Sequence, residues 1–168
     1  MAMINRFAFI FGAINVVLGI LSMFRPFVRH PPRRGIARLL PRRDHVGVFN
    51  KGTGQLLGVM GAVNPPHAVM HTTLGAAGLA TRRFPNLAKP YIWLTALYML
   101  ALAGLGWATV GMKPGNHNVM GLAMDRTDNI IHTLWGAGAL ALALMPILNS
   151  GRMNQREAMR MVEVGLSE

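Results

Sequence analysis

Two histidines at equivalent positions of a repeated pattern are the residues of this sequence that are best placed to do chemistry. His71 ends the stretch "NPPHAVMH", and His132 ends a second stretch, "DRTDNIIH". A polar residue, His67 or Asp128, stands four positions before each histidine, so each pair shares one face of a helix. Imidazole nitrogens in such positions can hydrogen-bond across a helix interface, ligate the metal of a cofactor, or carry protons.

The other polar residues of the two stretches are typical of helix starts. Asn64 and Asp125 are preferred N-cap residues, and Pro65 follows Asn64 at the first helical position, where its missing N–H is not needed. Asp128 is placed to reach back to the cap backbone, as the acid of a capping box does, and to face the positive end of the helix dipole. We therefore interpret the following residues as structural polar boxes that start two helices: Asn64, Pro65, His67, Asp125, Asp128 and Asn129.

His71 and His132 are not explained by helix starts, because they lie about 10 Å further along their helices. Three interpretations stay open for them. They can hydrogen-bond to each other or to Asp128, bind haem iron or chlorophyll magnesium, or line a proton or substrate path in a small transporter. We expect no resident cofactor, with haem or chlorophyll at His71 and His132 as the alternative. We expect no metal-ion site, since a dinuclear site would need more carboxylates than Asp125 and Asp128 or thiolates, and the chain has no cysteine.

Motifs of catalysis are absent from the sequence. It contains no phosphate-binding glycine loop followed by Lys-Ser or Lys-Thr, no convincing Ser-His-Asp order, and no carboxylate pair within an apolar segment. We therefore expect a protein that is not an enzyme.

The composition is typical of a membrane protein. Of the 168 residues 52% are hydrophobic and only 14% are charged, against about 25% charged in soluble domains. The apolar residues cluster in segments that are about long enough to cross a bilayer at 1.5 Å per residue. We expect transmembrane helices at about 4–24, 64–82, 91–112 and 126–148.

The internal repeat predicts how these helices are arranged. The offset that sets His71 against His132 also aligns Thr72 with Thr133 and Gly75 with Gly136, so helices 1–2 and helices 3–4 form equivalent units. Small residues in "GAAGLA" and "GAGALALA" allow close approach of helix backbones, and we expect helices 2 and 4 to touch through them. The predicted fold is an all-α integral membrane protein. Its four transmembrane helices form two tandem two-helix repeats, a pseudo-two-fold bundle and one domain over residues 1–148.

Basic residues dominate a loop at 25–51, three arginines lie in a tail at 149–168, and the net charge of the chain is +11. Beside a transmembrane helix such a loop contacts anionic lipid headgroups or an acidic partner rather than nucleic acid. Arginines at i, i+4 and i+8 make the tail an amphipathic basic helix. The residues that we assign to lipid or partner contact are Arg25, Arg29, Arg33, Arg34, Arg38, Arg42, Arg43, Arg152, Arg156 and Arg160.

The paired polar stretches resemble a bacterial family of small four-helix membrane proteins that is classed only as a domain of unknown function. Its pattern is matched before helix 2 and again before helix 4. This chain has Ala68 where the family usually has asparagine. The resemblance implies a four-helix integral membrane fold and brings no activity. The matching residues are Asn64, His67, His71, Gly75, Gly78 and Leu79, followed by Asp128, Asn129 and His132.

These observations lead us to expect a non-catalytic, multi-pass protein of a bacterial cytoplasmic or intracytoplasmic membrane. We expect it to act by contact, as an accessory or scaffold subunit of a larger membrane complex of photosynthetic or respiratory type. Its expected partners are the lipid bilayer and the other subunits of that complex. The alternatives are a haem- or chlorophyll-binding protein and a small transporter.

Overall fold

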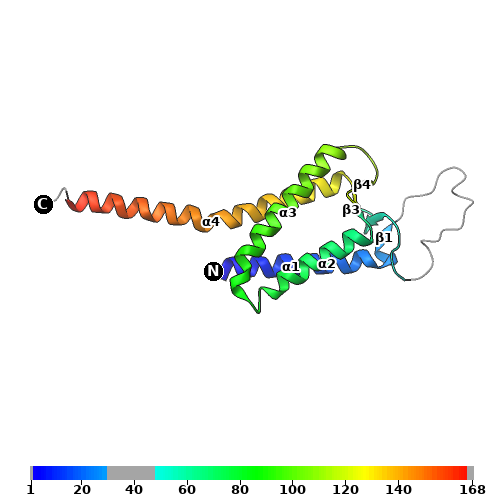
Figure 1. The fold of residues 1–168 in the computed structure, drawn as a ribbon, viewed down its shortest axis with the longest axis horizontal. Coiled ribbons are helices and arrows are strands. Elements are labelled where there is room, and N and C mark those ends of the chain that lie inside the picture. Colours follow the sequence, from blue (N-terminus) through cyan, green and yellow to red (C-terminus); the bar gives the residue numbers. More distant parts are fainter. Residues whose placement is uncertain (1, 30–47, 166–168) are drawn as a thin grey trace, which may run out of the picture.

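Four helices make up most of the described chain (Figure 1). The computed structural model describes residues 2–29 and 48–165, and for residues 2, 146–158 and 160–165 it describes the backbone only. The predicted helix starts near 64 and 126 lie within one or two residues of the observed ones. The helices are α1 (Ala2–Met23), α2 (Pro65–Ala80), α3 (Ala88–Thr109) and α4 (Arg126–Gly165).

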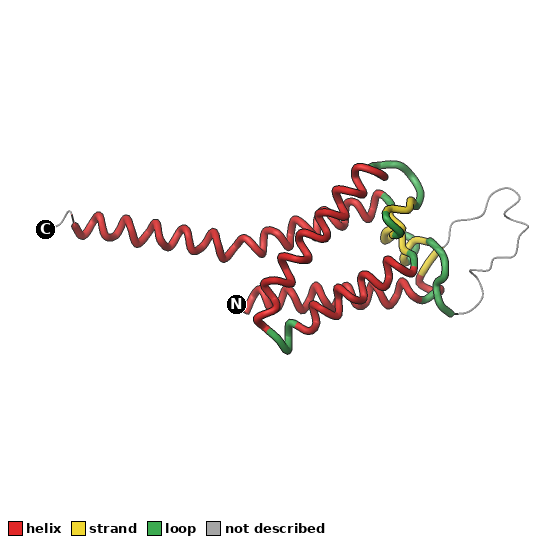
Figure 2. The backbone as a smooth tube through the Cα atoms, in the orientation of Figure 1, coloured by secondary structure: helices red, strands yellow, loops and turns green. Residues whose placement is uncertain are grey.

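Two small antiparallel sheets lie at one end of the helices, so the expectation of an all-α fold is wrong in this respect (Figure 2). The hairpin turns at Gly58 and Gly121 have positive φ angles, and so do Leu57 and Met120 just before them, a backbone conformation that suits tight hairpin turns. Pairing in strands gives these short apolar segments partners for their backbone amides. One sheet contains β1 (Val28–Arg29), β2 (Gly54–Leu56) and β3 (Met60–Val63), and the other contains β4 (His117–Val119) and β5 (Leu122–Met124).

The order helix, hairpin, helix occurs twice along the chain. In the first unit α1 packs along α2, with the β2–β3 hairpin between them in sequence, and in the second unit α3 packs along α4 around the β4–β5 hairpin. Strand β3 of the first unit contacts β5 of the second, so the two hairpins meet where α2 and α4 begin. The structure thereby brings together the two polar stretches, which lie far apart in the sequence.

The small residues pack within each unit and not, as we expected, between α2 and α4. Gly75 and Gly78 face α1, where a Cβ on Gly12 would lie 2.6 Å from backbone atoms of Gly78 and Leu79. Gly136 of α4 correspondingly faces Leu100 of α3. Close approach of backbones is still the function of these residues, but the backbone partner is the preceding helix of the same unit, and Gly78 also packs against the Tyr91 side chain of α3.

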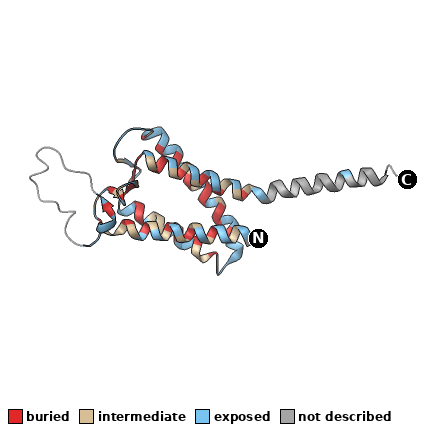
Figure 3. Ribbon diagram, turned by 180° about the vertical axis from the view of Figure 1, so that it is seen from behind, coloured by how far each residue is buried: buried red, intermediate tan, exposed pale blue. Residues whose placement is uncertain are grey.

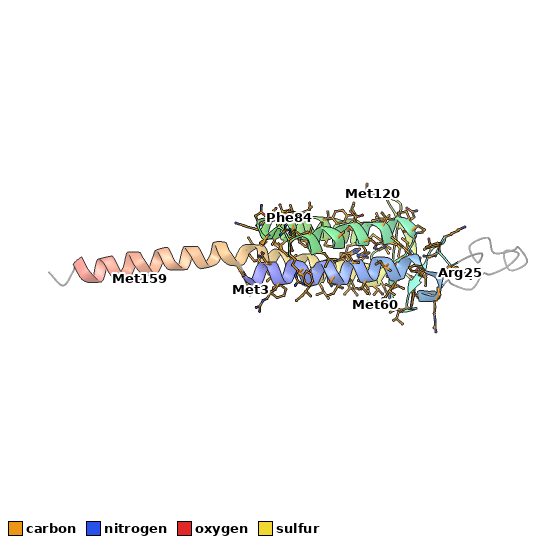
Figure 4. All side chains as sticks on the ribbon, turned by 90° about the horizontal axis from the view of Figure 1, so that it is seen from below. Met3, Arg25, Met60, Phe84, Met120 and Met159 are labelled. Atoms are coloured by element: carbon orange, nitrogen blue, oxygen red, sulfur yellow. The ribbon has the colours of Figure 1, made fainter. Side chains whose placement is uncertain are left out.

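Helix α4 does not end near residue 148 as predicted but continues to Gly165 through the sequence "NSG". A single glycine costs a helix only about 1 kcal/mol relative to alanine, and "MNQREAMRM" consists mainly of good helix formers. Figures 1 and 4 show this continuation beyond the ends of the other helices, with Met159 far from the bundle. We call residues 146–165 the α4 arm.

Two helical segments, Met3–Met23 and Pro85–Thr109, are long and apolar enough to cross a membrane. Helix α2 has 16 residues, which span about 24 Å, less than the roughly 30 Å of a bilayer core. Buried residues gather on the sides where the helices face one another, and exposed residues line the outside (Figure 3). Large apolar side chains are exposed along α1 at Phe7, Ile10, Ile14, Val17 and Ile20.

Candidate functional site

Helices α2 and α4 begin with side-chain caps at the residues that the sequence singled out. Asn64 accepts a hydrogen bond from the backbone N–H of His67 at 3.1 Å, with Pro65 at the first helical position. Asp125 Oδ1 accepts from the N–H groups of Thr127 and Asp128, at 2.8 and 3.1 Å. Asp128 Oδ2 accepts in return from the Asp125 N–H at 2.8 Å, which completes a capping box.

The two units exchange equivalent hydrogen bonds at this end. His67 Nδ1 lies 2.8 Å from the carbonyl oxygen of Ala123, and Asp128 Oδ2 accepts from the N–H of Ala62 at 2.7 Å. Ala62 and Ala123 occupy equivalent positions of the internal repeat, as do His67 and Asp128. The third residue of α2 and the third residue of α4 therefore each bind the hairpin of the other unit, as expected around a two-fold axis.

Three histidines converge behind these contacts. The rings of His67 and His71 stack with centroids 4.8 Å apart, and the His132 ring lies 5.9 and 6.4 Å from them. One nitrogen from each ring lies within 4.8 Å of the other two, so that the rings could share one ion. The His71 contacts are with Asn15 of α1, at 2.7 Å, and with His67, at 3.1 Å. We call His67, His71 and His132 the histidine cluster.

The hydrogen bonds that we expected from His132 to His71 or Asp128 are not among those of the described residues. Within the described part of the chain His132 Nδ1 is buried without a hydrogen-bond partner, and Asp128 uses its Oδ2 for the two backbone amides of the hairpin and the cap. The sequence reasoning also missed Asn15, which is buried and contacts His71. The available signal was an amide in the middle of an otherwise apolar helix, a position that such residues take up when they have a partner.

A small cavity of about 40 Å³ adjoins the cluster. Its volume is far below the roughly 300 Å³ at which pockets for drug-sized ligands begin, so it does not accommodate the ring of haem or chlorophyll. Residues of both units line it, including all three histidines, Ser22 of α1 and Asp128 of α4. The site is therefore sized for a small species.

A wider pocket of about 700 Å³ lies on the outside, between the two hairpins. Arg29, Gln55 and Asn64 line it from the first unit, and Asn116 and His117 line it from the second. The polar groups of its lining include side-chain amides, the Arg29 guanidinium and the His117 imidazole.

Asn129 joins α3 to α4 and does not take part in the cluster. Its Nδ2 donates to the carbonyl of Gly111 at 2.9 Å, just beyond the end of α3, and its Oδ1 has no partner. Ala68 is the equivalent residue of the first unit and is fully buried. A packed methyl group at Ala68 therefore stands where the second unit has the Asn129 amide.

The basic residues are divided between two ends of the molecule. Arg25 lies at the hairpin end, whereas the α4 arm extends from the other end (Figure 4). Arg29 forms part of β1 and lines the outer pocket. Arg152, Arg156 and Arg160 lie on the α4 arm, of which the backbone is described. Outside the described residues are Arg33, Arg34, Arg38, Arg42 and Arg43.

Comparison with known proteins places the chain in a family. No curated protein and no solved structure matches it. One family model, described as a domain of unknown function, DUF4383, matches residues 5–145. The match includes all four helices up to the start of the α4 arm, both hairpins and the histidine cluster. It confirms the resemblance drawn from the paired polar stretches, and the chain belongs to the DUF4383 family.

Proposed function

We propose that the protein is a non-catalytic, multi-pass membrane protein that acts as an accessory subunit of a larger membrane complex. The observation that carries this proposal is the α4 arm, which continues the last helix beyond the bundle (Figure 1). The arm spans about 30 Å at 1.5 Å per residue, and helices in proteins gain most of their stability from packing against other groups rather than from intrinsic propensity. A partner or a membrane surface would supply the missing contacts.

The outer faces of the bundle support a membrane location. Exposed apolar side chains recur along α1 every three or four residues, and α3 exposes Leu94, Leu97 and Leu105. A face of this kind is unfavourable in water and favourable against lipid tails or against another apolar helix. We propose that all four helices lie in a bacterial inner membrane, with the short α2 sheltered beside α1.

The host that we propose is an energy-transducing complex of photosynthetic or respiratory type. The three arginines of the α4 arm suit contact with acidic surfaces and anionic lipids around large membrane assemblies. Binding of haem or chlorophyll at His71 and His132 is a weaker alternative, because the cavity of about 40 Å³ is too small for a macrocycle. Transport of a small species is the third alternative, and it is supported by the four ionisable side chains, three histidines and Asp128, that border this cavity.

Cysteine labelling tests the four-span topology directly, because the natural chain has no cysteine to remove. Single cysteines at Asn86, Asn116 and Met159 are placed at the α2–α3 connection, beside the second hairpin and on the α4 arm. In sealed vesicles, a membrane-impermeant maleimide is expected to label Asn86→Cys and Met159→Cys from one side and Asn116→Cys from the other. Labelling of all three from the same side would contradict the proposal.

Removal of the α4 arm tests the accessory role. Full-length protein, extracted from its native membrane in mild detergent, is expected to run on native gels with a complex larger than a detergent-bound monomer. A chain that ends after residue 145 is expected to leave that complex while the helical circular dichroism of its bundle is kept. If the full-length protein runs as a monomer, or if the shortened chain stays in the complex, the arm does not dock a partner.

A further inference from the structure

We propose that the histidine cluster binds a single first-row transition metal ion that prefers imidazole ligands, namely Zn(II) or Cu(II). The three rings come from both units of the fold, His67 and His71 from α2 and His132 from α4. One nitrogen of each lies within 4.8 Å of the others. The site shares His71 and His132 with the haem or chlorophyll alternative but takes a bare ion in place of a macrocycle, and it does not depend on the accessory role.

The hydrogen bonds around His67 and His71 fix the tautomers of both rings. The Ala123 carbonyl can only accept a hydrogen bond, so His67 Nδ1 must carry the proton that it donates across 2.8 Å. Asn15 Nδ2 donates to the Phe11 carbonyl at 2.9 Å, which leaves Asn15 Oδ1 as the acceptor facing His71 Nδ1 at 2.7 Å. His71 Nδ1 must therefore carry a proton as well.

With both protons on Nδ1, the two Nε2 atoms of neutral rings point lone pairs at each other. They are 3.1 Å apart, and neither has a proton to share. An additional proton would satisfy the contact but would bury a positive charge, which is costly. A metal ion accepts both lone pairs at once. Ligation through Nε2, with Nδ1–H bound to a carbonyl or amide oxygen, is the usual arrangement of metal-binding histidines.

His132 supplies the third ligand. The residue is only 2% exposed, and its Nδ1 has no hydrogen-bond partner among the residues that the structure describes, an uncommon and costly state for a buried polar atom. The ring lines the cavity of about 40 Å³ together with His67 and His71. That volume holds a metal ion and one small ligand such as water.

The distances between the ligand nitrogen atoms suit one ion if the three imidazole rings move slightly closer together. Tetrahedral ligands at about 2.0–2.1 Å from a zinc ion are about 3.3 Å from each other. His67 and His71 are already at this separation, with 3.1 Å between their Nε2 atoms. The most distant ligand pair, at 4.8 Å, must approach by about 1.5 Å.

The donor set selects the class of ion. Three imidazoles suit zinc and copper, whereas magnesium and calcium require oxygen ligands. The Asp128 carboxyl group lines the same cavity and can balance part of the cation's charge. From the sequence we expected no metal site, because we counted only carboxylates and thiolates as further ligands. We also did not expect the His67 side chain to face His71, since we had assigned this residue to the helix start.

Metal titration of the full-length protein in detergent, with any affinity tag removed, tests the proposal. Chelator-treated protein is expected to bind one equivalent of Zn(II) or Cu(II) with a dissociation constant below about 1 μM, and no Mg(II) under the same conditions. Competition with a coloured chelator measures the affinity of each ion separately. Electron paramagnetic resonance of the Cu(II) form is expected to show three equatorial nitrogen ligands.

Variants then assign the ligands. His71→Ala and His132→Ala are expected to weaken binding at least about 100-fold, and Asn15→Leu, which removes the acceptor that orients His71, about 10- to 100-fold. His117→Ala is the matched control, because His117 lies on β4 outside the cluster, and binding should be unchanged.

Absence of stoichiometric binding to the wild-type chain overturns the proposal, whatever the behaviour of the variants. So does equal binding by His71→Ala, His132→Ala and His117→Ala, or a Cu(II) spectrum without nitrogen ligands. If a ligand variant fails to fold, the spectrum of the wild-type protein and the Asn15→Leu affinity still decide the matter. If the full-length protein binds the metal ion but runs as a monomer on native gels, the accessory role is refuted and the metal site is not.

Discussion

The contact between α1 and α2 leaves no room for a side chain at Gly12, and the cost of adding one can be worked from the structure. A Cβ at this position would lie 2.6 Å from the carbonyl carbon of Gly78 and the nitrogen of Leu79, whereas carbon atoms in contact are about 3.5–4.0 Å apart. Both neighbours are backbone atoms, so no rotamer change relieves the overlap. In Gly12→Ala the two helices must therefore separate by about 1 Å, and such overpacking costs about 1–3 kcal/mol.

A matched substitution separates this effect from helix propensity. Gly104 lies on α3, where a Cβ would meet no atom within 4 Å, so Gly104→Ala is expected to gain up to about 1 kcal/mol from helix propensity alone. Gly12→Ala gains the same helix propensity, so the unfolding free energies of the two variants should differ by the overpacking cost, about 1–3 kcal/mol. Titration with sodium dodecyl sulfate in mixed micelles, followed by circular dichroism, measures this difference.

Equal stability of the two variants would refute the reasoning, because it would mean that α1 and α2 are not in backbone contact at Gly12. A second control is Gly138→Ala on α4, where nothing lies within 4 Å of the added group. This variant should behave as Gly104→Ala does. A large loss of stability in either control would also contradict the assignment of open space at these positions.

Two further predictions concern the polar residues that join the units. Asp128→Ala leaves the buried N–H groups of Ala62 and Asp125 without their acceptor and is expected to cost about 2–4 kcal/mol in the same unfolding assay, whereas Asp128→Asn, which keeps one oxygen, should cost less. In Gly106→Ala the new methyl group overlaps the side-chain oxygen of Asn129, so the expected loss is about 1–2 kcal/mol, and it should shrink when Asn129 is also alanine. A loss that is the same in both backgrounds would show that Asn129 is not the group displaced.

Local signals predicted the helix starts well, and their limits are physical. Asn64, Pro65 and Asp125 identify helix starts because capping depends on a few neighbouring residues. The hairpins were missed because "LLGVMGAV" is apolar, and a short apolar run looks alike in a strand and in a buried helix. The helices that contact the small residues were predicted wrongly. Sequence spacing shows that small residues share one face of a helix, but it does not show which helix packs against that face.

The sequence predicted only two of the three histidines of the cluster as candidate ligands, for a related reason. His71 and His132 stood out as polar residues with no role in capping, and their rings lie close together in the structure. His67 was assigned to the helix start, where its backbone N–H does bind Asn64. Its side chain has a second role that depends on a carbonyl 56 residues away, at Ala123. A long-range partner of this kind leaves no pattern in a single sequence.

The exchange of hydrogen bonds between the two units also has a consequence for the order in which the protein is made. The contacts of His67 with Ala123 and of Ala62 with Asp128 join residues that lie far apart in the order of synthesis. At a translation rate of about 5–20 residues per second, the first half must wait for about 3–12 s before its partner emerges. During that interval its hairpin edge and paired histidines are open to another newly made first half. Two first halves of separate chains can therefore compete with the intended pairing, and slower translation would favour the mispaired dimer.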